Sequence, residues 1–485
     1  MKKNFLHILS LAIASVCMSS CHFLEVEKIG KSDIESYFSD VYALEGAVYG
    51  LSSLTYKYYD NYFILYPEIT GDMVKYSSTY NTHLPQYNYI SRESEETTMV
   101  GYLWKSGYEI LTNANEIIYF GPKLLKEYPE LSSRINTAVA QAYFIRALLH
   151  LDLSLAYAQH YTYTSDAGHL GIAIMNRVPG VTEKISRSSM AVTYSQIVTD
   201  LKDALKIFPE GYSNTWLPSP AACKALLARV SLYMGRYTEA ASYASEVISS
   251  YGFSLTPREK YTAMFCNVDT KGEEAIYRLS GVRQSSVLSS TFGYKDVKIY
   301  PSAKLLSIFS EDENQEHPDI RKSLLSYNGK DGESYQGVCM KYTITDDIAD
   351  NVKYVSPFVL RLSEMYLIRA EANCAANNTD AAADDIAELI ARATGVDKKT
   401  AKPAFSNAAE LEKIIQRERI KELFLEGHRQ FDITRRKENL ERDESTNSTV
   451  RTIKYPDDRF ILPIPLVELD ANKNMQSNPV NDTRQ

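Results

Sequence analysis

The sequence predicts a mainly α-helical protein, made of stacked helix pairs with a large irregular, loop-rich region and few short strands. Apolar residues recur at helical spacing along most of the chain, two segments repeat a helix–turn–helix pattern, and two long segments break it. The 485 residues are 44% hydrophobic and 24% charged, ordinary values for a folded globular protein. This composition excludes a mainly disordered chain and a polytopic membrane protein.

Net charge and tyrosine content narrow the class of partner. The formal net charge is −8, so the chain lacks the basic surface that a general nucleic-acid binder needs. It holds 36 tyrosines but only 2 tryptophans. Because tyrosine offers a flat apolar face and a polar tip, this enrichment indicates amphipathic contact surfaces.

The N-terminus has the pattern of an export signal. Lys2 and Lys3 precede a mostly apolar stretch, residues 5–17, that is too short to span a bilayer as a permanent helix. Met18-Ser19-Ser20-Cys21 then resembles a lipoprotein signal, in which Cys21 is acylated and residues 1–20 are removed. The alternative is an ordinary secretory signal that is cut elsewhere. No later run reaches ~18 apolar residues, so the N-terminal lipid is the expected membrane attachment.

The four other cysteines of the mature chain leave their pairing open. Cys223, Cys266, Cys339 and Cys374 allow three disulfide pairings, and the sequence does not choose among them. Cys223 and Cys374 lie in helical patterns among apolar neighbours, which favours buried free thiols. The chain has no CxxC and no HExxH motif, so we expect neither a metal site nor a cofactor.

The first helices follow from the spacing of apolar residues. A recurrence every three or four positions over 41–62 predicts an amphipathic helix. A second helix is expected over 103–118, closed by Gly121-Pro122. Residues 135–158 are apolar almost all round, so this helix should be buried on several sides.

Two later segments have the pattern of repeated helix pairs. Residues 193–207 form one more helix, and the spacing over 221–248 and again over 360–394 resembles a tetratricopeptide helix pair. Gly395 is a plausible C-terminal cap, and 410–425 is expected to be the last long helix. Such pairs cannot bury their apolar faces alone, so they should stack.

Two segments, 67–98 and 252–357, break the helical pattern. They are polar, rich in turn residues, and read as loops with a few short strands. A long irregular segment inside a compact domain is usually functional, so these segments form the predicted ligand region. We expect a single domain over 21–485, whose helical scaffold covers about 33–66, 99–250 and 358–435.

Three C-terminal blocks carry the most specific signal. They are Leu360-Arg361-Leu362-Ser363-Glu364 with Tyr366-Leu367-Ile368-Arg369-Ala370-Glu371-Ala372; Glu418-Arg419-Ile420-Lys421-Glu422-Leu423-Phe424-Leu425-Glu426-Gly427-His428-Arg429 with Phe431-Asp432-Ile433; and Phe460-Ile461-Leu462-Pro463-Ile464-Pro465 with Gln476-Ser477-Asn478-Pro479. In this order the blocks resemble the SusD/RagB family of outer-membrane nutrient-binding lipoproteins. The resemblance covers nearly the whole mature chain.

This resemblance implies a location and a role. Members of the family are lipid-anchored at the outer membrane, cap a TonB-dependent transporter, present oligosaccharides or in some cases peptides to it, and are not enzymes. We therefore expect a cell-surface, non-catalytic protein that captures oligosaccharides and delivers them to a partner TonB-dependent transporter. A peptide-binding protein in the same kind of assembly and a glycoside hydrolase are the alternatives.

The acidic residues of the second block have two interpretations. Glu418, Glu422, Glu426 and Asp432 would supply a glycosidase pair of carboxylates. The glutamates, however, recur at four-residue spacing and alternate with arginines, which favours a partly buried ion-pair network. Residues 463–465, Pro-Ile-Pro, are expected to form an extended strap, because proline prevents a helix there.

Saccharides bind by stacking a sugar ring on an exposed aromatic side chain while polar groups read the hydroxyls. One cluster on a predicted loop combines tyrosines with amides: Tyr76, Tyr80, Tyr87 and Tyr89, with Asn81 and Asn88. A second cluster holds Phe292 and Tyr294, with Arg283 and Gln284 as possible hydrogen-bonding residues. The tyrosines between 56 and 66 are interpreted as core or transporter-facing, and Trp104 as structural.

Overall fold

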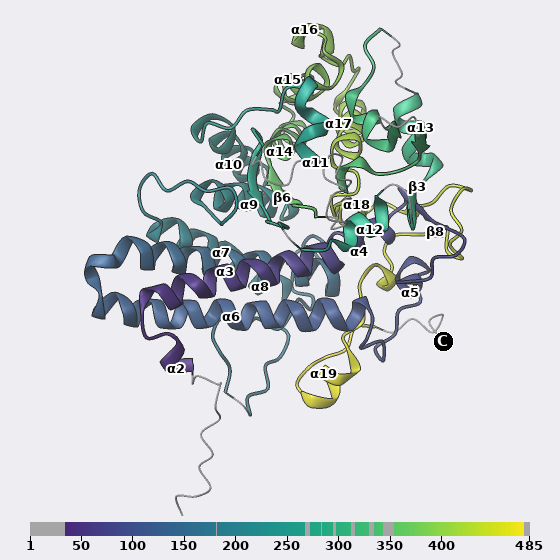
Figure 1. Ribbon diagram of the computed structural model, residues 1–485. Coiled ribbons are helices and arrows are strands. Elements are labelled where there is room, and N and C mark those ends of the chain that lie inside the picture. The colour runs from purple at the N-terminus through teal and green to yellow at the C-terminus, as the bar shows by residue number, and fades with distance from the viewer. Residues whose placement is uncertain are drawn as a thin grey trace, which may run out of the picture.

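The computed structural model describes residues 34–180, 182–266, 272–282, 284–293, 297–311, 316–328, 334–342 and 354–479. The predicted signal peptide, Cys21, Arg283 and Tyr294 lie outside these residues. The fold is mainly helical, as the sequence predicts (Figure 1).

The N-terminal part is a group of long helices packed side by side (Figure 1). α7 lies at its centre and packs on α3, α6 and α8. Leu148, Leu149, Leu151 and Leu153 follow one another along α7, and the side chains of all four are fully buried. The prediction that this helix is buried on several sides is therefore confirmed. The bounds are α3 (Val41–Tyr58), α6 (Met99–Glu127), α7 (Ser132–Tyr157) and α8 (Met190–Ile207).

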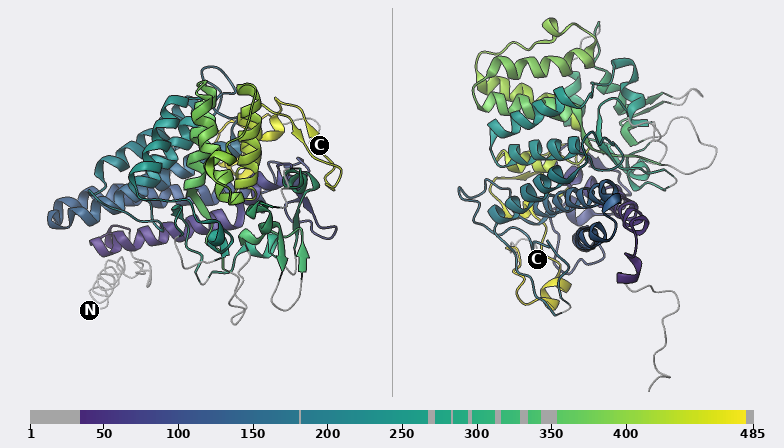
Figure 2. Two further views of the ribbon diagram at one scale, coloured as in Figure 1. Left: turned by 90° about the horizontal axis from the view of Figure 1, so that it is seen from above. Right: turned by 90° about the vertical axis from the view of Figure 1, so that its left-hand side faces the viewer.

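Antiparallel helix pairs continue the stack. The right-hand view of Figure 2 shows the purple and blue N-terminal helices at one end and the green helices that follow residue 358 at the other. Gly235 lies in the turn between the two helices of the first predicted pair at φ +70°, and Gly395 caps the last helix of the second pair at φ +79°. Both have a left-handed conformation that glycine adopts at little cost. Both predicted pairs are confirmed. They are α9 (Pro220–Tyr233) with α10 (Tyr237–Ser250), and α14 (Leu362–Ala375) with α15 (Thr379–Thr394), on which α17 (Ala408–Leu423) packs.

The predicted end of the second helix at Gly121-Pro122 is wrong, because α6 continues to Glu127. Proline disfavours a helical conformation in the preceding residue partly through that residue's Cβ, which Gly121 lacks. Gly121 also lets α6 approach α7 closely, since a Cβ there would lie 2.1 Å from Val139 Cγ2. The turn beyond the proline is stabilised by burial of Leu124.

The strands form four two-stranded antiparallel sheets within the described residues. Each joins segments that the loops bring together: Val74 pairs with Pro301, Ala275 with Arg361, Ser326 with Gln336, and Leu440 with Ile453. The strands are β1 (Val74–Tyr76), β2 (Ala275–Arg278), β3 (Ile299–Pro301), β4 (Ser326–Asn328), β5 (Ser334–Gln336), β6 (Phe358–Arg361), β7 (Leu440–Glu441) and β8 (Thr452–Ile453).

Short helices lie in the two segments that the sequence predicts to be irregular. Other short helices lie next to the long helices in the chain. α3 runs into a π-helical turn, Tyr59–Phe63. The short helices are α2 (Ile34–Tyr37), α4 (Leu65–Ile69), α5 (Leu84–Tyr87), α11 (Tyr261–Cys266), α12 (Val287–Phe292), α13 (Ala303–Ser310), α16 (Lys398–Ala401), α18 (Arg429–Arg435) and α19 (Leu466–Ala471), with 3-10 turns at Pro129–Leu131, Arg258–Lys260, Ile320–Leu325, Met340–Tyr342 and Asp458–Phe460.

Several smaller predictions are also confirmed. The strap over 462–465 is extended and buried, and the Leu462 N–H donates to the Ala156 carbonyl at 2.8 Å. Cys223 and Cys374 are buried free thiols, as is Cys339. Trp104 is buried, as are the tyrosines at 56, 58, 59 and 66. Among the described helices, none is long and apolar enough to cross a bilayer.

Candidate functional site

The predicted tyrosine cluster lies against the protein core rather than in an exposed loop. Tyr76 ends β1 and Tyr87 ends α5, and their rings stack at a centroid distance of 4.1 Å and an interplanar angle of 12°. Tyr76, Tyr87 and Tyr89 are 4%, 0% and 5% exposed. The expectation that these three rings offer open faces to a ligand is wrong.

The cause is a set of polar partners, of which all but Thr70 lie in a segment more than 350 positions away in the sequence. The Tyr87 hydroxyl donates to Asn447 Oδ1 at 3.0 Å, and the Tyr89 hydroxyl bonds the Thr70 carbonyl. Arg442 places its guanidinium 4.7 Å from the Tyr87 ring centroid and 5.3 Å from that of Tyr89. A cation over an aromatic face is a stabilising contact when both groups lose water. These partners draw the rings inward.

One tyrosine of the cluster keeps an exposed side. Tyr80 is half-buried, and its ring lies tilted 5.3 Å from the ring of Tyr76, while Asn81 beside it is exposed. Asn447 is also exposed, although its Oδ1 accepts the Tyr76 N–H at 3.2 Å and the Tyr87 hydroxyl. Tyr80 and Asn447 thus contact the Tyr76–Tyr87 pair and keep exposed surface, as Asn81 does beside Tyr80, and we call these three residues the Tyr80 surface.

Two further features of this region bear on the sequence interpretation. His83 precedes α5 at φ +58°, and burial lowers its pKa to about 4, so its imidazole is neutral near pH 7. The sequence analysis does not include Asn447 among the candidate binding residues, because Asn447 lies outside the two predicted loop segments. The signal that could have found it is the polar run over 443–449, between β7 and β8.

The aromatic ring of the second predicted cluster that the structure describes is also not exposed. Phe292 is fully buried and stacks on Tyr342 at a centroid distance of 5.8 Å. Its predicted exposure is therefore wrong, because α12 turns this ring toward the 3-10 turn over 340–342. Arg283 and Tyr294 lie outside the described residues, and Gln284 is half-buried.

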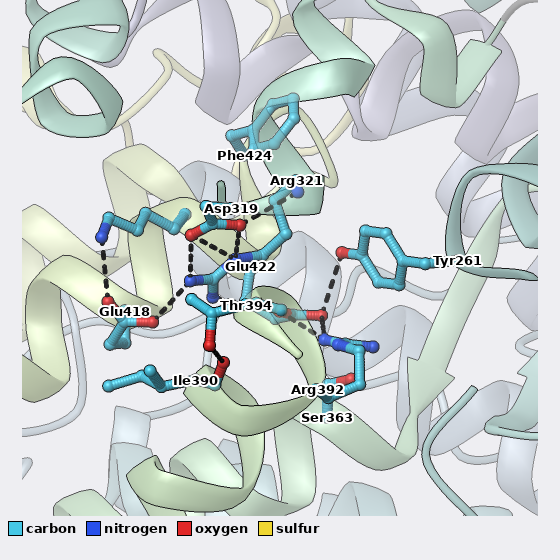
Figure 3. Close-up of polar contacts among 12 residues, drawn as sticks. Tyr261, Asp319, Arg321, Ser363, Ile390, Arg392, Thr394, Glu418, Glu422 and Phe424 are labelled. Atoms are coloured by element: carbon cyan, nitrogen blue, oxygen red, sulfur yellow. Dashed lines mark hydrogen bonds and ion pairs between the residues drawn. The ribbon is translucent and has the colours of Figure 1, made fainter. Parts of the chain in front are cut away.

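The acidic motif forms a buried ion-pair network centred on Glu422 (Figure 3). Arg392 donates to both Glu422 carboxylate oxygens at 2.7 Å, and Arg361 donates to Oε1 at 2.7 Å. Arg321 contacts Oε2 at 3.3 Å, and the Tyr261 hydroxyl donates to Oε1 at 3.1 Å. The interpretation of this motif as an ion-pair network is confirmed.

The network attaches the loop-rich region to the helical repeats. Arg321 comes from the segment between α13 and β4, and it also pairs with Glu418 on α17 at 2.7 Å. Lys341, from the turn before β6, donates to Glu426 and to the carbonyls of Glu422 and Phe424. These cations would be costly to bury without partners. The network therefore fixes the loops relative to α15 and α17.

A related ion-pair cluster positions β1. Asp72 accepts from Arg429 Nε at 2.6 Å and from Lys304 Nζ at 2.6 Å, which joins the approach to β1 with α18 and α13. The two cations hold the pKa of the Asp72 carboxyl well below its usual range. The segment that leads into β1 is thus held by charged residues of α18 and α13.

The motif glutamates are unsuited to glycoside hydrolysis. A general acid for that reaction needs a raised pKa and access to substrate. Glu422 is fully buried, and its arginines hold its carboxyl pKa well below the usual range. Arg361 and Lys341 likewise lower the pKa of Glu426. Over the described part of the chain, no group of three or more His, Cys, Asp or Glu side chains could hold a metal ion.

The stacked helix pairs and the buried charge network define the class as a helical-repeat protein. Two family models match the chain: one described as the SusD family over residues 256–480, and one described as starch-binding and associating with the outer membrane over residues 23–232. The chain belongs to the SusD/RagB family. This is a family of non-catalytic, carbohydrate-binding proteins associated with the outer membrane, so the prediction that the chain is not an enzyme is confirmed.

Relatives agree with this assignment. A SusD-like protein P2 from Formosa agariphila is 25% identical over 297 residues, which are 60% of this chain and 55% of that protein. The matched region therefore spans about half the length of this curated relative. A SusD superfamily protein from Bacteroides thetaiotaomicron has a similar structure, with a TM-score of 0.78 and 24% identity over 91% of this chain and all of that one. A SusD-like carbohydrate binding protein from Bacteroides vulgatus has a TM-score of 0.72 and 18% identity over 92% and 99%. At these identities the two structures show the fold alone.

Proposed function

We propose that the mature protein is a surface lipoprotein that captures oligosaccharides and delivers them to a partner TonB-dependent outer-membrane transporter. The observation that carries this proposal is the pair of family matches, which together cover most of the chain and include a starch-binding, outer-membrane description. The lipoprotein-like sequence at Met18–Cys21 supports attachment by an N-terminal lipid.

The Tyr80 surface is the proposed contact with the oligosaccharide. Tyr80 offers part of an aromatic face for a sugar ring, and Asn81 offers an amide that both donates and accepts hydrogen bonds. Its ring also contacts Tyr76, which belongs to the buried Tyr76–Tyr87 stack. This small and partly exposed platform favours modest affinity, which suits a protein that releases its ligand to a transporter.

Replacing Tyr80 and Asn81 together by alanine is expected to weaken oligosaccharide binding about thirtyfold. A lost aromatic contact is worth ~1 kcal/mol and a lost hydrogen bond ~1 kcal/mol, and every ~1.4 kcal/mol is tenfold in Kd. Isothermal titration with maltoheptaose and other neutral oligosaccharides measures the effect. Tyr49→Ala is the matched control, because Tyr49 is a 65% exposed tyrosine on α3.

Two outcomes would contradict the proposal. Undiminished binding by the double variant, with an unchanged helical circular dichroism signal, would place the site elsewhere. Saturable binding of short peptides with no oligosaccharide binding would favour the peptide-binding alternative. Genes for peptidases next to this one, rather than for glycosidases, would point the same way.

The Cys21→Ala variant is expected to lose its lipid and to leave the membrane fraction. The reason is that no described helix could span a bilayer, so the acyl chains are the proposed anchor. Fractionation of cells, with metabolic labelling by a fatty-acid analogue, measures both effects. Ser20→Ala serves as the control, because alanine fits before a lipidated cysteine. An unlabelled wild-type protein would refute lipidation.

A further inference from the structure

A groove separate from the Tyr80 surface lies among the helical repeats. It has a volume of about 650 Å³, within the ~300–1,000 Å³ that ligand clefts span. Its walls come from the α9–α10 turn, α14, α17 and the end of α18. None of the residues of the Tyr80 surface lines it.

The floor of this repeat groove is a buried charge cluster. Glu371 accepts from Arg435 Nη2 at 2.9 Å and from Arg436 Nη2 at 2.7 Å. The side chain of Arg436 is only 8% exposed, and its Nε has no hydrogen-bond partner among the described residues. This N–H has less than 1 Å² of exposed surface, so Arg436 helps to form the floor of the groove and its Nε is not a contact for a ligand.

The rim holds carboxylates that the protein leaves largely unpaired. Within the described residues, no hydrogen bond or ion pair involves the half-buried carboxylate of Glu438. Glu412 accepts from Gln416 at 3.2 Å and lies 3.9 Å from Arg436. Burial raises the pKa of both carboxyls. Tyr237, 40% exposed, adds an aromatic face at the same rim.

The balance of charge selects the class of ligand. The groove is lined by three carboxylates and three cations: Glu371, Glu412, Glu438, Arg435, Arg436 and Lys437. An anionic ligand would face the carboxylates, and a cationic ligand would face the arginines and the lysine. A neutral polyol avoids both conflicts, because its hydroxyls can donate to the Glu438 carboxylate while one sugar ring stacks on Tyr237, which lines the same groove.

We propose that the repeat groove is a second saccharide site, which binds a neutral oligosaccharide against Tyr237 and Glu438. It extends the proposed carbohydrate-binding function to a surface separate from the Tyr80 surface. The two sites can therefore be tested one at a time, and the groove can bind even if the Tyr80 surface does not.

The test compares variants of each surface in the mature chain. The probes are maltoheptaose, cellohexaose, xylohexaose and mannohexaose, measured by titration calorimetry with hydrogen exchange to locate the contact. Tyr237→Ala combined with Glu438→Ala should weaken groove binding at least about tenfold, and sugar should protect amides over 235–240 and 408–416 in the wild-type protein. The Tyr80→Ala, Asn81→Ala variant should keep that protection. Glu239→Gln, at an exposed neighbouring position, is the control.

The outcomes separate the two proposals. Protection at the groove that survives in the Tyr80 variant and disappears in the groove variant supports the second site, whatever the Tyr80 surface does. If no probe protects the groove, or if the groove variant binds every probe like the wild-type protein, the second site is refuted. Protection of the same amides by trialanine but by none of the sugars would show a peptide site instead. If the melting temperature of the groove variant is lowered, Tyr237→Leu and Glu438→Gln are compared instead, because leucine keeps apolar bulk but removes the aromatic face and glutamine removes the charge. Both should weaken binding without unfolding, and unchanged binding by both would also refute the site.

Discussion

The Asp432→Ala variant is expected to lose ~3–5 kcal/mol of unfolding free energy, the usual cost of removing one partner of a buried ion pair. Asp432 Oδ2 accepts from Arg419 Nε at 2.7 Å, and Oδ1 accepts from Arg435 Nε at 2.8 Å. Arg419 is 1% exposed, and its two terminal nitrogens have no hydrogen-bond partner among the described residues. Without Asp432 its charge would be buried with no close counter-ion.

Urea unfolding followed by circular dichroism at 222 nm measures this loss. The matched control is Asp470→Ala, which removes an exposed carboxylate 3.3 Å from Lys473. Exposed pairs contribute at most ~1 kcal/mol, so the control should be close to the wild-type protein. An Asp432→Ala variant of full stability that no longer binds oligosaccharide would show that this motif is a ligand site rather than a scaffold.

Glu68→Gln is expected to remove a pH dependence of stability between about pH 4.5 and 7. The Glu68 side chain is fully buried on α4, and burial raises the pKa of its carboxyl from 4.5 to about 7. Its Oε1 accepts the N–H groups of Gly427 at 2.8 Å and His428 at 3.0 Å, and Oε2 has no partner within the described residues. A neutral carboxyl suits such a place better than a carboxylate does.

The direction of this pH dependence follows from the number of protons that each state binds. Between the two pKa values the folded protein binds more protons at Glu68 than the unfolded chain does. The contribution of this group is therefore complete below pH 4.5 and is lost as the pH rises through about 7. A shift from 4.5 to about 7 corresponds to ~3 kcal/mol, since each pKa unit is worth ~1.36 kcal/mol.

The measurement is the difference in unfolding free energy between Glu68→Gln and the wild-type protein from pH 4.5 to 8.5. Glutamine keeps an oxygen for the two N–H groups, and the cost of its unpaired amide is the same at every pH. The difference should therefore shift in favour of the variant by ~3 kcal/mol as the pH rises. Glu444→Gln, at an exposed position, should give a flat difference. A flat difference for Glu68→Gln as well would show that its carboxyl is not neutral in the folded protein.

The local sequence pattern was sufficient to predict the helical scaffold and the charge network. The apolar run over 135–158 becomes α7, and the two helix pairs and the Gly395 cap lie where the spacing puts them. These features depend on periodicities of three and four residues, which are visible within one segment. The alternation of glutamate and arginine over 417–429 likewise indicated ion pairs, because charges at that density are stable in a core only when they are paired.

The exposure of the aromatic residues was decided by tertiary structure alone. Tyr76, Tyr87 and Tyr89 have polar neighbours in sequence, yet Arg442, Thr446 and Asn447 cover them from a segment that the loop pattern did not include. Helix α6 continues through Pro122 for the same kind of reason, since its last turn packs where Gly121 meets Val139. The sequence by itself determined which segments are helices and that their charges pair. Which rings meet solvent depended on partners hundreds of residues away, because burial is a property of the assembled chain.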